Sequence, residues 1–562
     1  MRRLVLFLAL LAPEPLFAQS STHPLDGLAT AEYWSVYDAL QSAGHLTPET
    51  KFTSVLLHPP SKATVLAWKP GQPVSREADV VLLRDSKTYT ARVDIATKRV
   101  VEFGELKGAQ SAFLASEMFG ADAYIKKDAR IIEALRKRGI SDLRTVSCSA
   151  LPVAYRAVPA QATERVGFGS CSRTHGTYHS WGRSVIDEGR ARSALYEASV
   201  SKLFVPYMDP GNGWNNRAFI DAGEFFAGVG FLKPLKPGLD CPAGATWFDG
   251  QTISEDGAPR LTSRLACLFE RAPENPAWRH LQGSEVYGRP SRELVLRSAA
   301  TIGNYDYLLD WRFTPDGTLT VAVGATGVIE TKSTTMTAAH DAHSGPETGQ
   351  LVAEGVIGVN HDHYFSYRLD FDVDGTSNSF MLNRMVPQRV DNDPMRKSIW
   401  VNQPVVAARE KDAILDIRLD QPSMWMFMNP SVRGSLNYAV AYEVMPGATA
   451  KSILSGDDPV QRIGAFSEHQ FWVTPYNEAE RYAAGTYPTS SDANDGLAVW
   501  TKANRTIENT DIVGWYTLGF HHITRAEDWP VMPTMWHEFA IRPFHFFKKN
   551  PVLDLPKSLN GQ

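Results

Sequence analysis

The chain has 562 residues, of which 43% are apolar and 21% charged; these values are typical of a globular protein and exclude a collagen-like, coiled-coil or wholly disordered chain. The formal net charge is −5 and no long block of Lys or Arg occurs, so the sequence gives no electrostatic support for a nucleic-acid partner. The length predicts several domains, or one large β domain with smaller ones beside it.

The first segment, residues 1–19, is predicted to be a secretory signal peptide. Arg2 and Arg3 precede an apolar run over 4–12, and small residues follow near Ala18. This run is much shorter than the roughly twenty apolar residues that span a bilayer, and no later segment is long enough either. We therefore expect a secreted or periplasmic protein without a membrane partner.

Two small α+β domains are predicted next. Residues 23–106 show helical periodicity over 29–40, followed by alternating strand patterns at 80–83 and 88–95.

The second small domain, residues 107–188, begins with predicted helices over 110–119 and 129–138. From 189 to 556, short alternating strands recur between Gly, Pro, Asn and Asp turns. This pattern predicts a large antiparallel β-sandwich, so the fold class is mainly β with two small α+β domains in front.

Four cysteines favour an oxidising compartment: Cys148, Cys171, Cys241 and Cys267. Four cysteines allow three pairings, and proximity in the chain favours Cys148–Cys171 and Cys241–Cys267. Each bridge would contribute roughly 3 kcal/mol to stability.

A histidine pair lies in a segment that alternates like a strand. Residues i and i+2 of a strand face the same way, so His361 and His363 can present two imidazoles to one ion. A third ligand must come from a distant segment, and the candidates are His521 and His522, after the strand-like 513–518. Three neutral imidazoles suit Cu(II), Zn(II) or Fe(II), and spacing alone does not choose among them.

An acidic run follows the histidine pair. Asp370, Asp372 and Asp374 alternate with apolar residues and imitate the start of an EF-hand loop, which fails at Met381 where Glu is needed. If the strand is unbroken from His361, these carboxylates lie on the face opposite the imidazoles. The run is either a hard-cation site or a solvated strand face.

Five segments in chain order resemble those of the copper amine oxidases. The segment 298–307, SAATIGNYDY, is similar to the family's cofactor-forming motif T-x-x-N-Y-[DE], and the HDH pair with the following RLD and DG is similar to its copper strand. The others are VPYMDP at 205–210, FIDAGE at 219–224 and GFHHITRAEDWPVMP at 519–533. The resemblance covers 190–556, and it extends more weakly to the two small domains.

The resemblance implies a primary-amine oxidase, which converts a primary amine and O₂ to an aldehyde, ammonia and hydrogen peroxide. Tyr305 would become topaquinone beside copper held by His361, His363 and His522. In the family the histidine three residues before Arg525 is the ligand, which selects His522 over His521.

Other roles are implied by matching positions. Asp221 would be the catalytic base, Tyr207 would hydrogen-bond the O4 of the quinone, and Asn304 and Asp306 would help to hold the ring. Phe219 stands where the family often has a gate Tyr, which favours an apolar channel suited to an aromatic or a long aliphatic amine.

The resemblance also implies a second metal and a partner. Calcium would be bound by Asp370, the carbonyl of Phe371, Asp372, Asp511 and the carbonyl of Ile512, and the protein would be a homodimer. Two other interpretations of the histidines stay open: a mononuclear copper or iron oxygenase without a quinone, and a non-catalytic copper-binding β-sandwich.

Overall fold

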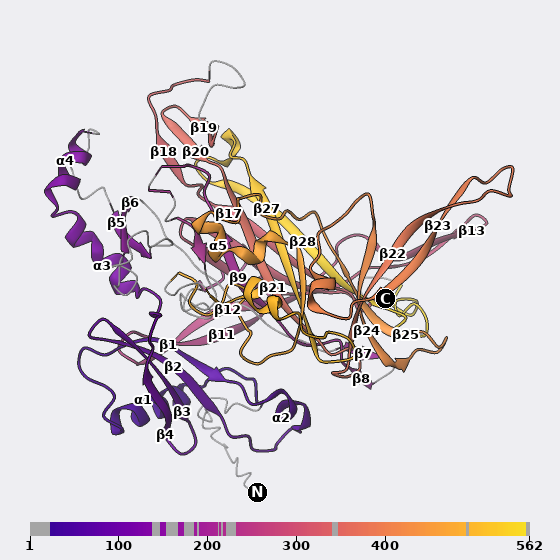
Figure 1. Ribbon diagram of the computed structural model, residues 1–562, viewed down its shortest axis with the longest axis horizontal. Coiled ribbons are helices and arrows are strands. Elements are labelled where there is room, and N and C mark those ends of the chain that lie inside the picture. The colour runs from indigo at the N-terminus through magenta and orange to yellow at the C-terminus, as the bar shows by residue number, and fades with distance from the viewer. Residues whose placement is uncertain are drawn as a thin grey trace, which may run out of the picture. The chain divides into compact units, whose positions relative to one another are not determined.

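The computed structural model describes ten stretches of the chain: 23–137, 147–152, 167–172, 185–187, 190–211, 213–214, 217–220, 232–339, 347–489 and 494–557. The predicted signal peptide and Asp221 lie outside the described residues. The chain divides into two compact units (Figure 1): unit 1 comprises Met1–Asp85, Tyr89–Gly104 and Gln251–Leu261, and unit 2 comprises the rest. Among the described helices, none is both long and apolar enough to cross a membrane.

Unit 1 is built on an antiparallel sheet in the order β1-β2-β3-β4. Helix α1, Thr30–Ser42, buries Tyr33, Val36, Ala39 and Leu40, whose spacing places them on one face. The predicted helix at 29–40 and the strands at 80–83 and 88–95 are confirmed. The other elements are α2 (Lys62–Ala67), β1 (Lys51–His58), β2 (Glu77–Arg84), β3 (Lys87–Asp94) and β4 (Arg99–Glu105).

The predicted helix at 110–119 is displaced along the chain: α3 spans Ala115–Ile125. The Ser111 amide donates to Oγ1 of Thr88 at 2.8 Å, which holds the start of the predicted range out of the helix. Oε2 of Glu117 accepts from the Leu114 amide at 2.7 Å and caps the helix at 115.

The helix α4, Ala129–Lys137, confirms most of the second predicted helix. Beyond it, β5 (Ser147–Pro152) pairs with β6 (Gly167–Ser172), and the register places Cys148 directly opposite Cys171. The backbone thus brings together the two cysteines that were expected to pair, although their side chains lie outside what is described.

Two large antiparallel sheets form the sandwich of unit 2, which confirms the predicted mainly β fold. The ten-stranded sheet follows the order β11 (Thr246–Ile253), β12 (Pro259–Arg271), β15 (Glu293–Ile302), β16 (Tyr305–Phe313), β17 (Leu319–Gly327), β28 (Met532–Phe544), β25 (Ala439–Met445), β24 (Ser423–Arg433), β22 (Ser379–Arg389), β23 (Ser398–Val406). The five-stranded sheet follows the order β10 (Phe219–Ile220), β9 (Leu195–Val205), β21 (His361–Phe371), β27 (Ile512–His522), β26 (Phe471–Pro475).

Smaller elements surround these sheets. They are β7 (Val185–Asp187), β8 (Arg190–Arg192), β13 (Pro276–Gln282), β14 (Glu285–Pro290), β18 (Thr331–Ser333), β19 (Gly349–Ala353), β20 (Val356–Val359), α5 (Pro459–Ile463), α6 (Leu497–Trp500), η4 (Glu410–Ala413), η5 (Ala465–Glu468), η6 (Thr501–Ala503) and η7 (Ala526–Asp528).

The central strand of the five-stranded sheet, β21, is buried on both faces along its whole length. It is hydrogen-bonded to β9 on one side and to β27 on the other, and the ladder with β27 runs without a break from His361↔His522 to Phe371↔Ile512. One face packs against the ten-stranded sheet in a continuous apolar core. Side chains at alternate positions of β21 therefore have fixed and opposite directions.

A tight hairpin turn positions Tyr305. Strands β15 and β16 pair as far as Ile302↔Tyr305, which leaves only Gly303 and Asn304 in the turn, with Gly303 at φ +58°. On the other side of Tyr305 lies Gly327, at φ +104°, where a Cβ would come within 2.7 Å of the Asn304 carbonyl oxygen. Only glycine fits at such a close approach and such a dihedral angle.

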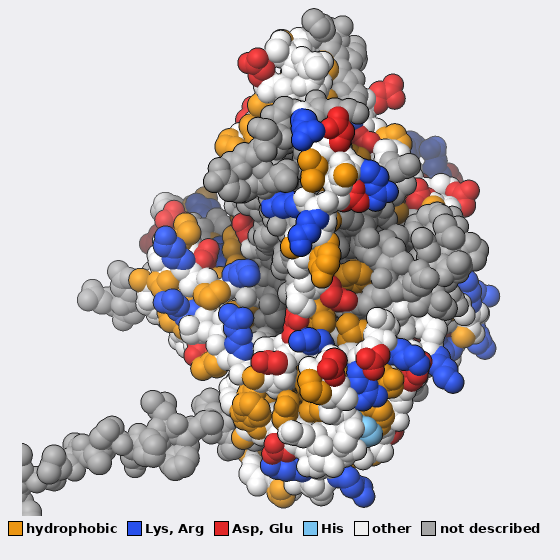
Figure 2. Space-filling model, turned by 90° about the vertical axis from the view of Figure 1, so that its left-hand side faces the viewer, with side chains coloured by type: hydrophobic (Ala, Val, Ile, Leu, Met, Phe, Trp, Pro, Cys, Tyr) orange, Lys and Arg blue, Asp and Glu red, His pale blue; other side chains and the backbone are white. Residues whose placement is uncertain are grey.

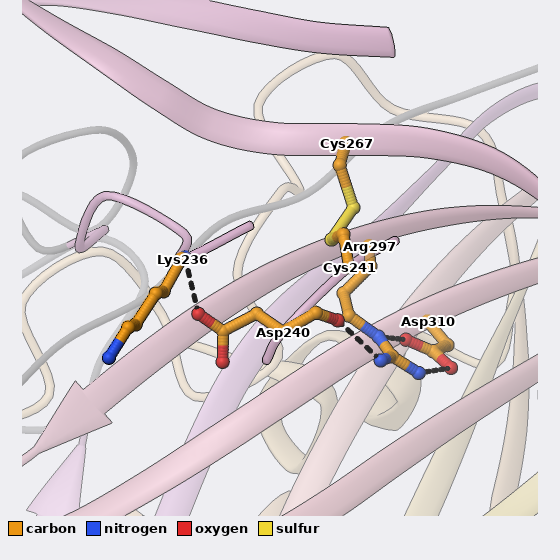
Figure 3. Close-up of a disulfide and its surroundings, with 6 residues drawn as sticks. All are labelled: Lys236, Asp240, Cys241, Cys267, Arg297 and Asp310. Atoms are coloured by element: carbon orange, nitrogen blue, oxygen red, sulfur yellow. Dashed lines mark hydrogen bonds and ion pairs between the residues drawn. A yellow bond between two sulfur atoms is a disulfide. The ribbon is translucent and has the colours of Figure 1, made fainter. Parts of the chain in front are cut away.

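One predicted disulfide, Cys241–Cys267, is present and joins cysteines that are 26 positions apart in the sequence (Figure 3). It attaches the segment before β11 to β12. Beside it, Arg297 donates two hydrogen bonds to the fully buried Asp310 at 2.6 and 2.8 Å and a third to the Asp240 carbonyl at 2.7 Å (Figure 3). The bridge and this ion pair hold the same loop.

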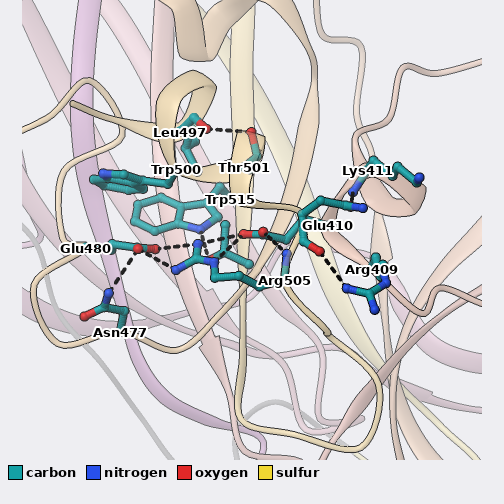
Figure 4. Close-up of polar contacts among 12 residues, drawn as sticks. Arg409, Glu410, Lys411, Asn477, Glu480, Leu497, Trp500, Thr501, Arg505 and Trp515 are labelled. Carbon is teal, nitrogen blue, oxygen red and sulfur yellow. Dashed lines mark hydrogen bonds and ion pairs between the residues drawn. The ribbon is translucent and has the colours of Figure 1, made fainter. Parts of the chain in front are cut away.

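A second buried ion network joins three segments that are distant in sequence (Figure 4). The Arg505 guanidinium donates to Glu410 at 2.6 and 3.0 Å and to Glu480 at 2.6 and 3.0 Å. The Glu410 carboxylate is fully buried, so the arginine supplies the charge that compensates it.

Charges of both signs are mixed on the face drawn in Figure 2, where Lys and Arg lie among Asp, Glu and apolar side chains. No described area of that face is dominated by one sign, in keeping with the small net charge of −5.

Candidate metal centre

Three buried histidines meet between β21 and β27. His361 and His363 extend from one face of β21, and His522 is the register partner of His361 at the end of β27. Their exposed fractions are 1%, 0% and 4%, and one ring nitrogen from each lies within 4.8 Å of the others. The three imidazoles can therefore share one ion.

Hydrogen bonds fix which nitrogen two of these rings can offer. Nδ1 of His361 lies 2.8 Å from the Val359 carbonyl oxygen, which can only accept, so the proton is on Nδ1 and Nε2 has a free electron pair. In His522 the arrangement is reversed, because Nε2 lies 3.1 Å from Oδ2 of Asp528 and Nδ1 lies 3.2 Å from Nε2 of His361.

The third ring, His363, has one contact and one open nitrogen. Nδ1 lies 2.8 Å from the Tyr307 hydroxyl. Nε2 is buried and has no hydrogen-bond partner among the described residues. A buried polar atom without a partner is costly, and a metal ion at this position would satisfy it.

The protonation of the cluster suits metal binding. Burial lowers the pKa of His361 to about 3, and it also lowers the pKa values of His363 and His522. All three rings are therefore neutral near pH 7, which is the form that binds metals.

His521, the other candidate for third ligand, lies on the opposite face of β27. Its side chain is 40% exposed and Nδ1 contacts Oδ1 of Asp362 at 2.7 Å. Alternation along the strand therefore decides between the two neighbours, and His522 is the one in the cluster.

Tyr305 extends from β16 of the facing sheet directly into this cluster. Its hydroxyl lies 2.7 Å from Nε2 of His361 and 2.9 Å from Nδ1 of His522, the two nitrogens that carry free electron pairs. The ring is 1% exposed, and burial raises the pKa of the phenol well above its ordinary value. The neutral phenol thus lies within bonding reach of an ion held by the imidazoles.

Two further predicted residues lie next to this phenol. The Tyr207 ring stacks on His361 with centroids 4.8 Å apart, and its hydroxyl is buried near the Asn304 side chain, which partly offsets the effect of burial on the Tyr207 pKa. The Asn304 side-chain amide donates to the Val328 carbonyl, and the Asn304 backbone carbonyl accepts from the Val328 amide at 2.9 Å, which ties the turn before Tyr305 to the end of β17. The backbone of Phe219 lies in β10, but its side chain, like Asp221, is not described.

An acidic cluster forms on the other face of β21. Carboxylate oxygens of Asp370, Asp372 and Asp511 lie within 4.8 Å of one another. Phe371 and Ile512, whose carbonyls were expected to take part, are register partners at this end of the ladder. The buried Arg368 donates to Asp370 at 3.3 Å. Asp374 lies apart, in a turn at φ +49°, where it pairs with Arg192.

The family of the chain follows from sequence profiles that fit these same strands. The profile described as "Copper amine oxidase, enzyme domain" matches residues 182–562, which include every residue of the histidine cluster and Tyr305. The chain belongs to the copper amine oxidase family. A second profile, "Copper amine oxidase, N2 domain", matches residues 23–104.

Relatives and solved structures agree with this family. The chain is 43% identical over 375 residues to "Amine oxidase [copper-containing] gamma 2" of Arabidopsis thaliana, covering 65% of this chain and 54% of the relative. It is 38% identical over 375 residues to "Primary amine oxidase" of Lens culinaris, covering 66% and 56%. The chain thus spans about half the length of the curated relatives it matches.

The fold is also that of a solved copper-containing benzylamine oxidase from Hansenula polymorpha. That structure matches with a TM-score of 0.81 and 22% identity, over 95% of this chain and 100% of the other. A lysyl oxidase from Pichia pastoris matches with a TM-score of 0.79 and 17% identity, over 96% and 92%.

Two residues that contact the histidine cluster of this copper amine oxidase family member had no predicted role. Asp528 contacts His522, and its own carboxylate is fully buried; burial raises its pKa, but hydrogen bonds from His522 and Arg525 outweigh this and lower it. Tyr307 contacts His363. A metal-bound histidine usually has such a second hydrogen-bond partner. Asp528 and Tyr307 both lie within the segments that resemble the family, so a search of those segments for polar side chains could have identified them.

Proposed function

We propose that this chain is a primary-amine oxidase that converts a primary amine and O₂ to an aldehyde, ammonia and hydrogen peroxide. Copper would be held by His361, His363 and His522, and topaquinone would be formed from Tyr305. The observation that carries the proposal is the Tyr305 hydroxyl, 2.7 and 2.9 Å from two imidazole nitrogens that have free electron pairs. A non-catalytic copper-binding site would need the three imidazoles but would not need a buried phenol in contact with them.

The donor set fits copper. Three neutral imidazoles from β-strands suit Cu(II), and the unpartnered Nε2 of His363 is a buried polar atom that a metal ion would satisfy. His361 and His363 would bind through Nε2, and His522 through Nδ1, since Asp528 accepts the proton of its Nε2.

A quinone at position 305 with copper beside it supplies an electrophilic carbonyl and an electron sink, which no ordinary side chain offers. The chain's own residues orient and protect it. Burial raises the pKa of Tyr207, so its hydroxyl stays protonated and can donate to an oxygen on the ring at 305. The apolar core around Tyr305 excludes bulk water. The Asp221 carboxylate would accept the proton from the carbon next to the amine nitrogen.

Phenylhydrazine titration of protein loaded with copper in air tests the proposal. A coloured adduct at about one per chain is expected, and Tyr305→Phe should abolish the adduct while copper stays bound. Copper binding without any adduct would contradict the proposal. It would then favour a non-catalytic copper protein or a mononuclear oxygenase.

The role of Asp221 has a separate test. Asp221→Asn should form the quinone, measured by the same adduct, but lose amine oxidation by about 10²–10⁴-fold, the usual contribution of a general base. Turnover at the wild-type rate would remove Asp221 from this role. A panel of phenethylamine, benzylamine and putrescine would show whether the protein, which has Phe219 at the gate position, prefers an aromatic or an aliphatic amine.

The acidic cluster supports a structural calcium site. Asp370, Asp372 and Asp511 would supply carboxylate oxygens, and the carbonyls of Phe371 and Ile512 would complete the site. Such a site would join the ends of β21 and β27. Removing calcium with a chelator should lower Tm, and adding it back should restore Tm; in Asp372→Asn the chelator should have little further effect.

A homodimer is supported by a hairpin with exposed apolar side chains. The β22–β23 hairpin extends past β24 and β25 (Figure 1), and its outer part exposes Met395 by 91% and Trp400 by 64%. A second copy of the chain would cover such side chains. Light scattering should give twice the chain mass, and Trp400→Asp should shift the protein towards the monomer.

Export is supported by two observations. Arg2 and Arg3 precede an apolar run that is typical of a signal peptide, and the Cys241–Cys267 bridge needs an oxidising compartment. Fractionation of the native host should find the protein outside the cytoplasm, with an N-terminus near residue 19. A cytoplasmic protein that retains residues 1–19 would contradict export.

A further inference from the structure

We propose that Tyr307 is a positioning residue for copper, which it influences through His363. The inference rests on the proposed function, in that the histidine cluster holds copper. It concerns the second tyrosine of the N-Y-D-Y segment, whose contact with His363 is described above.

Two parallel contacts connect the facing sheets. Tyr305 and Tyr307 lie two residues apart on β16, and His361 and His363 lie two residues apart on β21, so both pairs face the space between the sheets. Tyr305 contacts His361 at 2.7 Å, and Tyr307 contacts Nδ1 of His363 at 2.8 Å. The phenol at 305 meets the nitrogen that faces the ion, whereas the phenol at 307 meets the nitrogen that faces away from it.

The chemistry of His363 then assigns the hydrogen bond. Copper needs the free electron pair on Nε2, the buried nitrogen without a described partner, so the single ring proton must lie on Nδ1. The Tyr307 oxygen is the described acceptor within reach of that proton. Tyr307 and His363 are both 0–1% exposed, so water does not replace the acceptor if it is lost.

The other two ligands have equivalent partners of different kinds. The Val359 carbonyl oxygen accepts from Nδ1 of His361, and the Asp528 carboxylate accepts from Nε2 of His522. Tyr307 completes the set with its phenol oxygen, 2.8 Å from Nδ1 of His363. Outer partners of this kind are worth about 10–100-fold in metal affinity.

The test is Tyr307→Phe, which removes the hydroxyl and keeps the ring. Apoprotein is loaded with Cu(II) without O₂, so Tyr305 stays unmodified, and the copper dissociation constant is measured by competition with a chelator. We expect binding to be weaker by about 10–100-fold. Tyr307→Leu, which also lacks the acceptor, is the second variant in case the first does not fold; Tm and circular dichroism monitor folding.

The matched control is Tyr367→Phe. Tyr367 is also 1% exposed and has a buried hydroxyl without a described partner, so its removal should leave copper affinity unchanged. Equal losses in Tyr307→Phe and Tyr367→Phe would overturn the inference, because any buried hydroxyl would then have the same effect. Wild-type affinity in Tyr307→Phe would overturn it as well.

Pulsed EPR of the Cu(II) protein provides a signature that a structural role would not change. The method detects the remote nitrogen of each coordinated imidazole, and its quadrupole coupling depends on the hydrogen bond of that N–H. The quadrupole coupling of one of the three remote nitrogens should change in Tyr307→Phe, and none should change in Tyr367→Phe. Three unchanged couplings would overturn the inference.

The two proposals fail in different ways. A wild-type protein that binds copper but forms no quinone in air contradicts the oxidase and leaves the Tyr307 measurement intact. A wild-type protein that binds no copper overturns both.

Discussion

Oδ2 of Asp528 lies 3.1 Å from Nε2 of His522 and leaves Nδ1 of that ring directed at the histidine cluster. His361 offers the opposite nitrogen, Nε2, because the Val359 carbonyl oxygen accepts from its Nδ1. The two rings come from adjacent strands and are register partners. The carboxylate of Asp528 thus determines that His522 presents Nδ1, and not Nε2, to the cluster.

Asp528→Ala should therefore weaken copper binding by about 10–100-fold, as loss of an outer partner usually does. Asp528→Asn keeps an oxygen that can accept from Nε2 of His522, so this variant should lose less copper affinity. The measurement is chelator competition on both variants, loaded without O₂. If both variants bind copper as tightly as wild type, Asp528 does not orient His522.

Gly327→Ala should disturb Tyr305 without touching a metal ligand. The new Cβ would lie 2.7 Å from the Asn304 carbonyl oxygen and 2.8 Å from the Asp306 amide nitrogen, so the backbone around Tyr305 must shift. We expect slower formation of the phenylhydrazine-reactive cofactor, with copper still bound.

The control for this change is Gly355→Ala. Gly355 also has a positive φ, +73°, but its nearest described neighbour would be 3.5 Å from the Cβ. Both variants carry a backbone strain of about 1–3 kcal/mol, and only Gly327→Ala adds a collision. Equal rates of cofactor formation in the two variants would show that the close approach at Gly327 is unimportant.

Arg505→Ala should destabilise the sandwich strongly, since it leaves the fully buried Glu410 without a compensating charge (Figure 4). Breaking a buried ion pair in this way costs about 3–5 kcal/mol. Urea unfolding measures the change. The control is Arg418→Ala at an exposed pair with Asp420, which should leave the free energy of unfolding unchanged. A small loss in Arg505→Ala would mean that water reaches Glu410 after truncation.

Asp416 predicts a pH dependence at the acid end. Burial raises its pKa, but hydrogen bonds from His469 and Lys451 outweigh burial and lower the pKa to about 2. A carboxylate with a depressed pKa adds stability above its unfolded pKa near 4. That stability is lost as the pH falls from about 4 to about 2.

Because the Asp416 side chain is 27% exposed, its contribution after solvent screening is about 1 kcal/mol. Asp416→Asn should therefore lower the free energy of unfolding at pH 7 by about that amount and match wild type near pH 2. A difference that persists at pH 2 would assign the effect to packing rather than to charge.

Much of the centre could be predicted from local patterns. Alternation placed His361 and His363 on one strand face and Asp370 on the other, because the period of a strand is exact. The choice between His521 and His522 could not be made from spacing, since adjacent residues differ only in which face of β27 they occupy. The resemblance made that choice, and the register His361↔His522 now explains it.

Other features depend on contacts that no local pattern contains. The start of α3 is set by the Ser111 amide, which bonds to Thr88 on a strand more than twenty residues earlier. The contact between Tyr307 and His363 exists only because β16 and β21 face each other from different sheets. Side chains such as Arg505 acquire their partners in the same way, when distant loops fold together.

The unbroken ladder between β21 and β27 has a consequence for how chains of this kind can vary in length. His361 and His363 lie on one face of β21, and the carboxylate of Asp370 lies on the other. Inserting or deleting a single residue within this strand would exchange the two faces beyond that point and separate the histidines or the carboxylates from the rest of their cluster. Length changes should therefore be confined to the connecting loops, and β21 should keep the same number of residues from one homologue to the next.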